Sequence, residues 1–307
     1  MSITHYIKKI GRGKDGARQL ERAQARDLFE QVLDGAVTDV ELGAFVLAMR
    51  IKGETPQEMA GFLDAVSSRL NKVPTSSLTT IVLPSYNGAR KLPALTPLLA
   101  LLLAREGFPV LVHGSTTEQS RVTSQSILAA LGVSCARTVG DIAPGSVQFL
   151  PTSVLCAGLQ RLLDVRRLVG LRNSAHSLVK LMNPCQGPAV VVSSYTHPEY
   201  AISMTATLCL MQQNALLLRG TEGEPVADAR RTPAMDAISE GVVTRVQDAQ
   251  VGPLTSIPEL PSPEVASTAT WIRDVLMEKA TLPTPVAQQV AHIVKLARET
   301  STNRANG

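Results

Sequence analysis

The chain has 307 residues, of which 44% are hydrophobic and 18% are charged. This length is sufficient to bury a substantial core in one large domain or two, and the composition excludes an intrinsically disordered chain. The formal net charge of +4 is modest, so the placement of the cations says more about possible partners than their total does.

The four cysteines are far apart without a CxxC pair, and the five histidines are scattered. We therefore expect small buried thiols in a reducing, cytoplasmic setting, with no metal site and no cofactor. The first residues, MSITHYIKKIGRGK, lack the apolar core of a signal peptide. The most apolar run, LLALLLA at 98–104, is too short to cross a bilayer, so no membrane association is expected.

The segment from 24 to 70 has the spacing of short amphipathic helices. Gly35 and Gly53 are suited to end two of them, and Thr55, Pro56 and Glu58 form a typical helix start with a capping box. The polar stretch at 71–80 contains a proline and is typical of a linker. We predict a small helical domain over 1–72 and a larger domain over 73–307.

Beyond the linker, short apolar runs rich in β-branched residues alternate with helical patterns. The predicted strands are 80–85, 109–114, 147–152, 189–194, 215–220 and 241–246. The predicted helices are 96–105, 119–131, 198–212, 263–280 and 284–299. This alternation predicts an α/β domain with a mostly parallel central sheet. Ligands of such sheets bind beyond the carboxyl ends of the strands, so the loops that follow the strands should converge on one crevice.

Cations gather near the N-terminus, where GRGKDG at 11–16 matches the GxGxxG pattern. The preceding HYIKKI does not resemble a buried strand, which disfavours a dinucleotide site and leaves a flexible turn or a basic turn that contacts phosphate. Arg18, Arg22 and Arg26 recur every four residues and indicate a basic stripe along one helix face. Such a stripe is either a solvated helix face or part of a surface that binds polyanions.

Further basic clusters occur at 161–180, at Arg90–Lys91 and at 219–231. Clusters of this kind suit contacts with a phosphate backbone. Aromatic residues make up only 3% of the chain, so extensive base stacking is not expected, and Tyr86 is the best single candidate for it.

The loop LPSYNGARK at 83–91 follows a predicted strand and precedes Thr96–Pro97, a predicted N-cap and first-turn proline. The free N–H groups of such a helix start bind the phosphate of a nucleotide or of a nucleic acid equally well. No carboxylate pair is apparent at the strand ends, which disfavours magnesium-assisted chemistry. His113 is either an acid or base, or a hydrogen-bonded structural residue at a strand end.

The segment LFEQVLDGAVTDVELGAFVLAMRIKGETPQEMAGFLDAV resembles the N-terminal domain of the anthranilate phosphoribosyltransferase family, also called glycosyltransferase family 3. The resemblance extends through nearly the whole chain. The family's glycine-rich GTGGD loop falls at Ser85–Lys91, where SYNGARK has lost the acidic residue. Its KHGNR motif corresponds to VHGST, and its SSxxGSAD motif corresponds to QSRVTSQS. These two segments keep His113, Gly114, Ser120 and Ser124.

The family's RTxFNLLGPLLNP motif is similar to RNSAHSLVKLMNP, which keeps Arg172 and has Lys180 in the GP position. In the family this arginine helps to bind the aromatic acceptor. The pair of acidic residues that binds magnesium falls at Pro225–Val226, and Arg219 stands at the preceding histidine. This loss of metal ligands and gain of cations resembles the TrpD2-type, YbiB-like subgroup, which implies a dimer that binds DNA and RNA with little sequence preference.

We therefore expect a homodimer, joined through its helical domain, that binds nucleic acid without sequence preference and has no catalytic residues. The predicted nucleic-acid contacts are Lys8, Lys9, Lys14, Arg18, Asn87, Arg90, Lys91, Arg121, Arg172, Lys180 and Arg219. The predicted phosphate contacts at the strand ends and helix start are Thr96, His113, Gly114 and Ser120. The alternatives are a phosphoribosyl or pentosyl transferase with an altered acceptor and metal site, and a scaffold for a protein partner.

Overall fold

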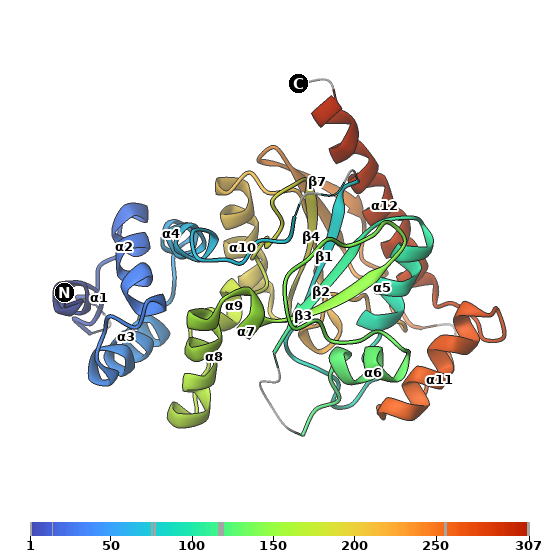
Figure 1. Ribbon diagram of the computed structural model, residues 1–307, viewed down its shortest axis with the longest axis horizontal. Coiled ribbons are helices and arrows are strands. Elements are labelled where there is room, and N and C mark those ends of the chain that lie inside the picture. Colours follow the sequence, from blue (N-terminus) through green and yellow to red (C-terminus); the bar gives the residue numbers. More distant parts are fainter. Residues whose placement is uncertain are drawn as a thin grey trace.

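The computed structural model describes residues 2–13, 15–74, 76, 78–115, 120–254 and 257–305. A small group of N-terminal helices lies beside a larger α/β part, as Figure 1 shows. The predicted fold class, a helical domain plus an α/β domain with a mostly parallel sheet, is confirmed.

The N-terminal helices are short and well capped. They are α1 (Thr4–Ile10), α2 (Arg22–Leu33), α3 (Asp39–Lys52) and α4 (Pro56–Ser67). Thr55 caps α4 in a capping box with Glu58, as predicted, and Gly53 ends α3 at a φ of 79° that favours glycine. The rings of Phe29 and Phe62 stack with centroids 4.5 Å apart in the core between these helices.

Two details of this part differ from the prediction. Helix α1 was not predicted, because its seven residues are too few to show a clear helical period. Helix α2 begins at Arg22, so Arg18 lies outside it and the predicted stripe of three arginines along one helix is wrong. Arg22 instead forms an ion pair with Asp64 of α4.

The sheet has seven strands in the order β3-β2-β1-β4-β5-β6-β7. The strands are β1 (Thr80–Ser85), β2 (Val110–Gly114), β3 (Val147–Pro151), β4 (Ala189–Tyr195), β5 (Ala215–Arg219), β6 (Met235–Ser239) and β7 (Val242–Gln247). The first five are parallel, and β6 and β7 are antiparallel. The predicted strands are confirmed to within two residues, whereas β6 was not predicted.

Helices cover both faces of the sheet (Figure 1). The α/β part contains α5 (Thr96–Arg105), α6 (Ser124–Ala130), α7 (Thr152–Leu155), α8 (Ala157–Val169), α9 (Ala175–Leu178), α10 (Pro198–Leu210), α11 (Val265–Leu276) and α12 (Thr284–Ala305). Strand residues alternate between two apolar cores. Val82 and Leu111 face the core shared with the N-terminal helices, α8 and α10, while Ile81 and Val112 face α5, α6, α11 and α12.

The N-terminal helices are joined to the α/β part by direct packing. The guanidinium of Arg161 on α8 donates to the carbonyl of Val32 at 2.6 Å. A Cβ at Gly158 would lie 2.2 Å from the carbonyl oxygen of Leu33, so only glycine permits this close approach of α8 to α2. These contacts fix the position of the N-terminal helices beside the sheet.

The loops that follow the parallel strands meet at one edge of the sheet, as predicted. Ser85 pairs with Gly114 across β1 and β2, and Tyr195 pairs with Arg219 across β4 and β5. Helix α12 reaches the opposite edge, where Ser301 hydrogen-bonds Thr79 just before β1. Among the described residues, no helix is long and apolar enough to cross a membrane.

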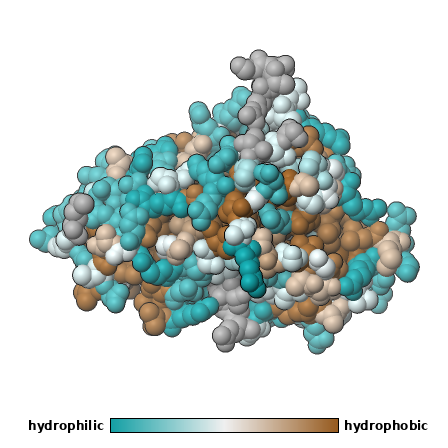
Figure 2. All heavy atoms as spheres, in the orientation of Figure 1, coloured by the Kyte–Doolittle hydropathy of each residue, from teal (hydrophilic) through white to brown (hydrophobic). Residues whose placement is uncertain are grey.

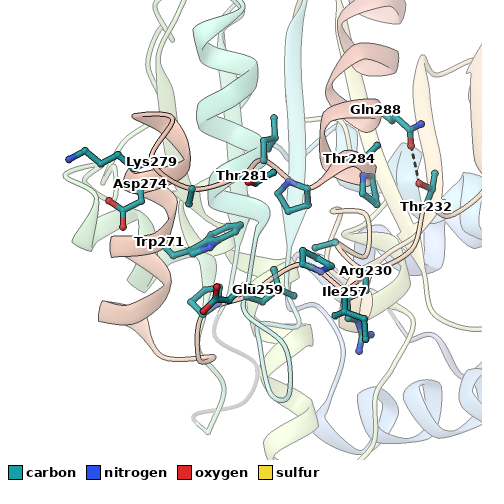
Figure 3. A pocket seen from close by; sticks show the side chains of 18 of the residues that line it. Arg230, Thr232, Ile257, Glu259, Trp271, Asp274, Lys279, Thr281, Thr284 and Gln288 are labelled. Atoms are coloured by element: carbon teal, nitrogen blue, oxygen red, sulfur yellow. Dashed lines mark hydrogen bonds between the residues drawn. The ribbon is translucent and has the colours of Figure 1, made fainter. Parts of the chain in front are cut away.

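A hollow of about 1390 Å³ lies elsewhere, between α11, the start of α12 and the segments that follow β6 and β7. Trp271 points into it, and Thr232 donates to Gln288 at 2.9 Å on its wall (Figure 3). None of the predicted site residues that the structure describes lines this hollow.

Candidate functional site

The carboxylate of Glu224 lies at the centre of the carboxyl edge of the sheet. Glu224 follows β5 in the chain and is buried, with only 2% of the residue exposed. One oxygen, Oε1, accepts the backbone N–H groups of Asn87 at 2.7 Å and Gly88 at 2.9 Å. The other oxygen, Oε2, accepts the hydroxyls of Ser85, of Thr96 at 3.1 Å and of Ser124 at 3.4 Å. We call these five groups the donor cluster.

Glu222, two residues before Glu224, binds the loop at 83–91 as well. Its carboxylate accepts the backbone N–H of Arg90 at 2.7 Å and of Lys91 at 3.1 Å, and its carbonyl accepts the side-chain amide of Asn87 at 2.9 Å. A Cβ at Gly223 would lie 1.8 Å from that amide nitrogen, and the residue has a φ of +86°, so both observations require glycine. The segment 222–224 therefore lies directly against the loop at 83–91.

The side chain of Lys180 binds the segment 222–224 through the backbone of that segment. Its ammonium donates to the carbonyls of Gly223 at 2.8 Å and Ser194 at 3.4 Å. Burial lowers the pKa of Lys180 to about 8, with nearby Arg172 adding to the effect and Glu224 opposing it. A buried ammonium held by two carbonyls does not fit the predicted role of Lys180 as a direct contact for nucleic acid.

His113 is a structural residue in this arrangement. It is fully buried, and its Nδ1 is 2.8 Å from the hydroxyl of Tyr86. Burial lowers the pKa of His113 to about 3, so the imidazole is neutral near pH 7 and offers a phosphate no charge. Tyr86 is only 4% exposed and does not present its ring for base stacking, contrary to our expectation.

Two other predicted phosphate contacts also have internal roles. Helix α5 begins at Thr96 and Leu95 is its N-cap, so the prediction that Thr96 caps this helix is wrong by one residue. Thr96 is fully buried and belongs to the donor cluster. A Cβ at Gly114 would lie 2.1 Å from the carbonyl oxygen of Ser85, so this glycine permits close approach of two strand ends. Ser120 is exposed beside the undescribed residues 116–119.

The exposed cations near the donor cluster are Arg90, Lys91 and Arg219. Arg90 and Lys91 engage Glu222 through their backbones, whereas their side chains are exposed. Arg121 is partly exposed, and its Cβ would lie 3.2 Å from a Cβ at Gly88. The structure therefore brings these predicted contacts to one edge of the sheet.

The predicted contacts near the N-terminus form a separate group. Lys8 and Arg18 are exposed, whereas the ammonium of Lys9 donates to Gln24 at 2.7 Å. Lys14 lies outside the described residues. Helix α1 lies at the far end of the N-terminal helices from the sheet, as Figure 1 shows, so these cations are not part of the crevice.

A pocket of about 530 Å³ lies between the N-terminal helices and the carboxyl edge of the sheet. Arg50 of α3, Arg172, His176 and Lys180 line it, together with Tyr200 at the start of α10. Burial first, and then the neighbouring cations led by Arg172, lower the pKa of His176 to about 4. The positive charge of this pocket near pH 7 therefore comes from Arg50, Arg172 and Lys180 and not from His176.

Sequence reasoning missed Glu222 and Glu224 as site residues, since it expected no carboxylates at the strand ends. The signal was the TEGEP sequence directly after the buried strand β5. Both oxygens of Glu224 already accept N–H and O–H groups, and Pro225–Val226 next to it carry no ligand atoms in their side chains. Within the described part of the chain, no group of three or more His, Cys, Asp or Glu residues could hold a metal. The site therefore does not fit a magnesium-bound pyrophosphate.

Known proteins resemble this chain in sequence as well as in structure. Residues 4–69 match the helical bundle domain of a glycosyl transferase family. The uncharacterized protein YbiB of Escherichia coli is 37% identical over 310 residues, which cover 98% of this chain and 96% of that protein. The anthranilate phosphoribosyltransferase of Methanosarcina acetivorans is 28% identical over 268 residues, which cover 84% and 67%. The chain belongs to the anthranilate phosphoribosyltransferase-like family.

Solved structures agree with this membership at the level of the fold. The anthranilate phosphoribosyltransferase of Thermus thermophilus superposes with a TM-score of 0.70 at 21% identity, covering 97% of this chain and 89% of that one. The enzyme of Saccharomyces cerevisiae in complex with PRPP and Mg also has a TM-score of 0.70, at 13% identity and with coverage of 98% and 89%. The family fold is thus kept in this chain.

Proposed function

We propose that this member of the anthranilate phosphoribosyltransferase-like family binds nucleic acid through its phosphate backbone and has no transferase activity. The observation that carries the proposal is the position of Glu224, which takes the donors that a substrate phosphate would need. The side chains of Arg90, Lys91 and Arg219 remain exposed around the same edge. Exposed cations beside a closed crevice suit a long polyanion better than a small phosphorylated substrate.

The absence of sequence preference is part of the proposal. Arg and Lys contacts to phosphate fix the position of a nucleic acid without reading its bases. Tyr86 is buried and the chain has few aromatic residues. Base stacking, which single-strand binders use, should therefore contribute little to binding at this crevice. Affinity should therefore depend mainly on charge and should fall steeply as salt is added.

A second candidate function is a transferase with an altered acceptor. The pocket of about 530 Å³ favours it, because Arg172 and Arg50 line a space large enough for a small aromatic acid. This candidate requires a phosphoribosyl donor, and the donor cluster is occupied by Glu224. Fold similarity alone does not establish activity, so we rank this function second.

Reversing the charge of Arg90 and Lys91 tests the proposed interface. Their side chains are exposed while their backbone N–H groups hold Glu222, so Arg90→Glu/Lys91→Glu should leave the fold intact. We expect at least a roughly tenfold weaker affinity for oligonucleotides at low salt, with a salt slope smaller by about 1.5 for the two lost contacts. The measurement is a salt titration of binding to single-stranded DNA, duplex DNA and RNA.

The matched control is Lys295→Glu/Arg298→Glu on α12. It makes the same change in net charge, with side chains that are 73% and 66% exposed. Helix α12 ends at the opposite edge of the sheet, so this pair should lie outside the interface. Equal losses of affinity in the two double variants would show that the carboxyl edge is not the binding surface.

We also propose that the protein is a homodimer joined through α3. Val40, Leu47 and Ile51 are 82%, 47% and 65% exposed and form a stripe along one face of this helix. Gly43 lies between them, and a Cβ there would meet no atom within 4 Å. A small residue within an exposed apolar stripe suits close packing of the same helix from a second copy, as in a two-fold interface.

A further inference from the structure

The donor cluster has the make-up of a phosphate site. Two successive backbone N–H groups, from Asn87 and Gly88, point at one oxygen of Glu224, and serine and threonine hydroxyls serve the other. Thr96, the first residue of α5, adds its hydroxyl to the cluster. Successive backbone N–H groups in a turn form an anion-binding concavity in many proteins.

The occupant of this site belongs to the chain itself. The Glu224 carboxylate is buried and comes from a segment far away in sequence, at separations of 100, 128 and 139 residues from its side-chain partners Ser124, Thr96 and Ser85. Glu222 beside it has a φ of 52°, which is unfavourable for a residue with a side chain. The turn is held in this conformation by Lys180 and Ser194, which both donate to the carbonyl of Gly223.

We propose that Glu224 is a built-in ligand of a phosphate-type anion site, which it closes to phosphate and pyrophosphate in the wild-type chain. A carboxylate and a phosphate oxygen accept the same N–H and O–H donors. Because Glu224 is covalently attached, it competes as an intramolecular ligand with any free anion. Removing its carboxylate should leave an open site for a phosphate group. This inference does not depend on nucleic-acid binding.

The test is the binding of inorganic pyrophosphate, without metal, to wild type and to Glu224→Ala. We expect saturable binding to Glu224→Ala, seen by calorimetry and by a thermal midpoint that rises with ligand concentration, and no saturation of wild type at concentrations about tenfold higher. Glu299→Ala on α12 makes the same charge change at a site that is 57% exposed, and should behave as wild type. Adding Ser85→Ala and Ser124→Ala to Glu224→Ala should abolish the binding, since both hydroxyls belong to the donor cluster.

Glu224→Ala leaves several buried donors without a partner and should be less stable than wild type. Acetate or pyrophosphate should restore its thermal midpoint, or its yield on refolding if it does not fold alone, with no effect on wild type. Pyrophosphate binding to wild type as tight as to the variant would overturn the proposal. So would a variant that neither ligand binds or rescues, or binding that survives loss of the two serine hydroxyls. None of these readouts uses nucleic acid, so failure here and failure of the proposed function are distinguishable.

Discussion

Lys52→Met should lower the free energy of unfolding by about 3–5 kcal/mol, because it leaves a buried carboxylate without its cation. The ammonium of Lys52 lies 2.6 Å from Glu58, and the two side chains are 9% and 0% exposed. Glu58 also accepts the backbone N–H groups of Leu20 and Thr55, so its carboxylate joins the chain before α2, the end of α3 and the start of α4. Methionine is unbranched like lysine and only one heavy atom shorter, so the loss reports mainly the charge.

Urea denaturation of Lys52→Met beside Arg26→Met measures this effect. Arg26 forms an exposed ion pair with Glu30 at 2.9 Å, with an arginine side chain that is 52% exposed, and its loss should cost less than about 1 kcal/mol. The difference between the variants therefore comes from burial, since both remove one cation from one ion pair. If Lys52→Met lowered the free energy of unfolding no more than Arg26→Met does, the prediction would be contradicted. The Glu58 carboxylate would then be stabilised by groups other than Lys52.

Leu47→Glu/Ile51→Glu should convert the proposed dimer into a monomer. In a two-fold interface each substitution occurs twice, and each buried unpaired charge costs about 3 kcal/mol, or more than a hundredfold in the dissociation constant. Light scattering after size exclusion should give twice the chain mass of 32.7 kDa for wild type and the chain mass for the variant.

The control for this variant is Val242→Glu/Val251→Glu. These valines are 64% and 87% exposed; one lies on the outermost strand β7 and the other just beyond it, away from α3. The control adds the same charge to exposed apolar positions and should remain a dimer. A wild-type protein that is monomeric at micromolar concentration, or a dimer that survives Leu47→Glu/Ile51→Glu, would contradict the proposed interface. Figure 2 shows hydrophobic side chains exposed at the end of the molecule formed by the N-terminal helices.

Much of the fold follows from local patterns in the sequence. Strands β1, β2, β4 and β5 contain apolar runs because both of their faces are buried, and the capping residues of α4 mark its start. Strand β6 was missed because MDAIS contains an aspartate and only partly follows an alternating pattern. Helix α8 was noted only for its arginines, although Leu159, Leu162 and Leu163 form its buried face.

The site was predicted less completely, for a physical reason. The sequence indicated which loops meet, and Arg90, Lys91, Arg172 and Arg219 do lie around the carboxyl edge. The partners of Glu224 are backbone N–H groups and small hydroxyls far away in the chain, and such donors carry no distinctive sequence pattern. Counting carboxylates near the loop at 83–91 therefore suggested an open cationic crevice, whereas Glu222 and Glu224 close it.

Calorimetric titration of the wild-type protein with phosphoribosyl pyrophosphate and Mg²⁺, beside a single-stranded oligonucleotide at the same low salt, tests the central claim most directly. We expect saturable, salt-sensitive binding of the oligonucleotide and no saturable binding of phosphoribosyl pyrophosphate, because Glu224 holds the donors that its pyrophosphate would need. Magnesium-dependent, saturable binding of phosphoribosyl pyrophosphate without any binding of the oligonucleotide would contradict it and favour the transferase.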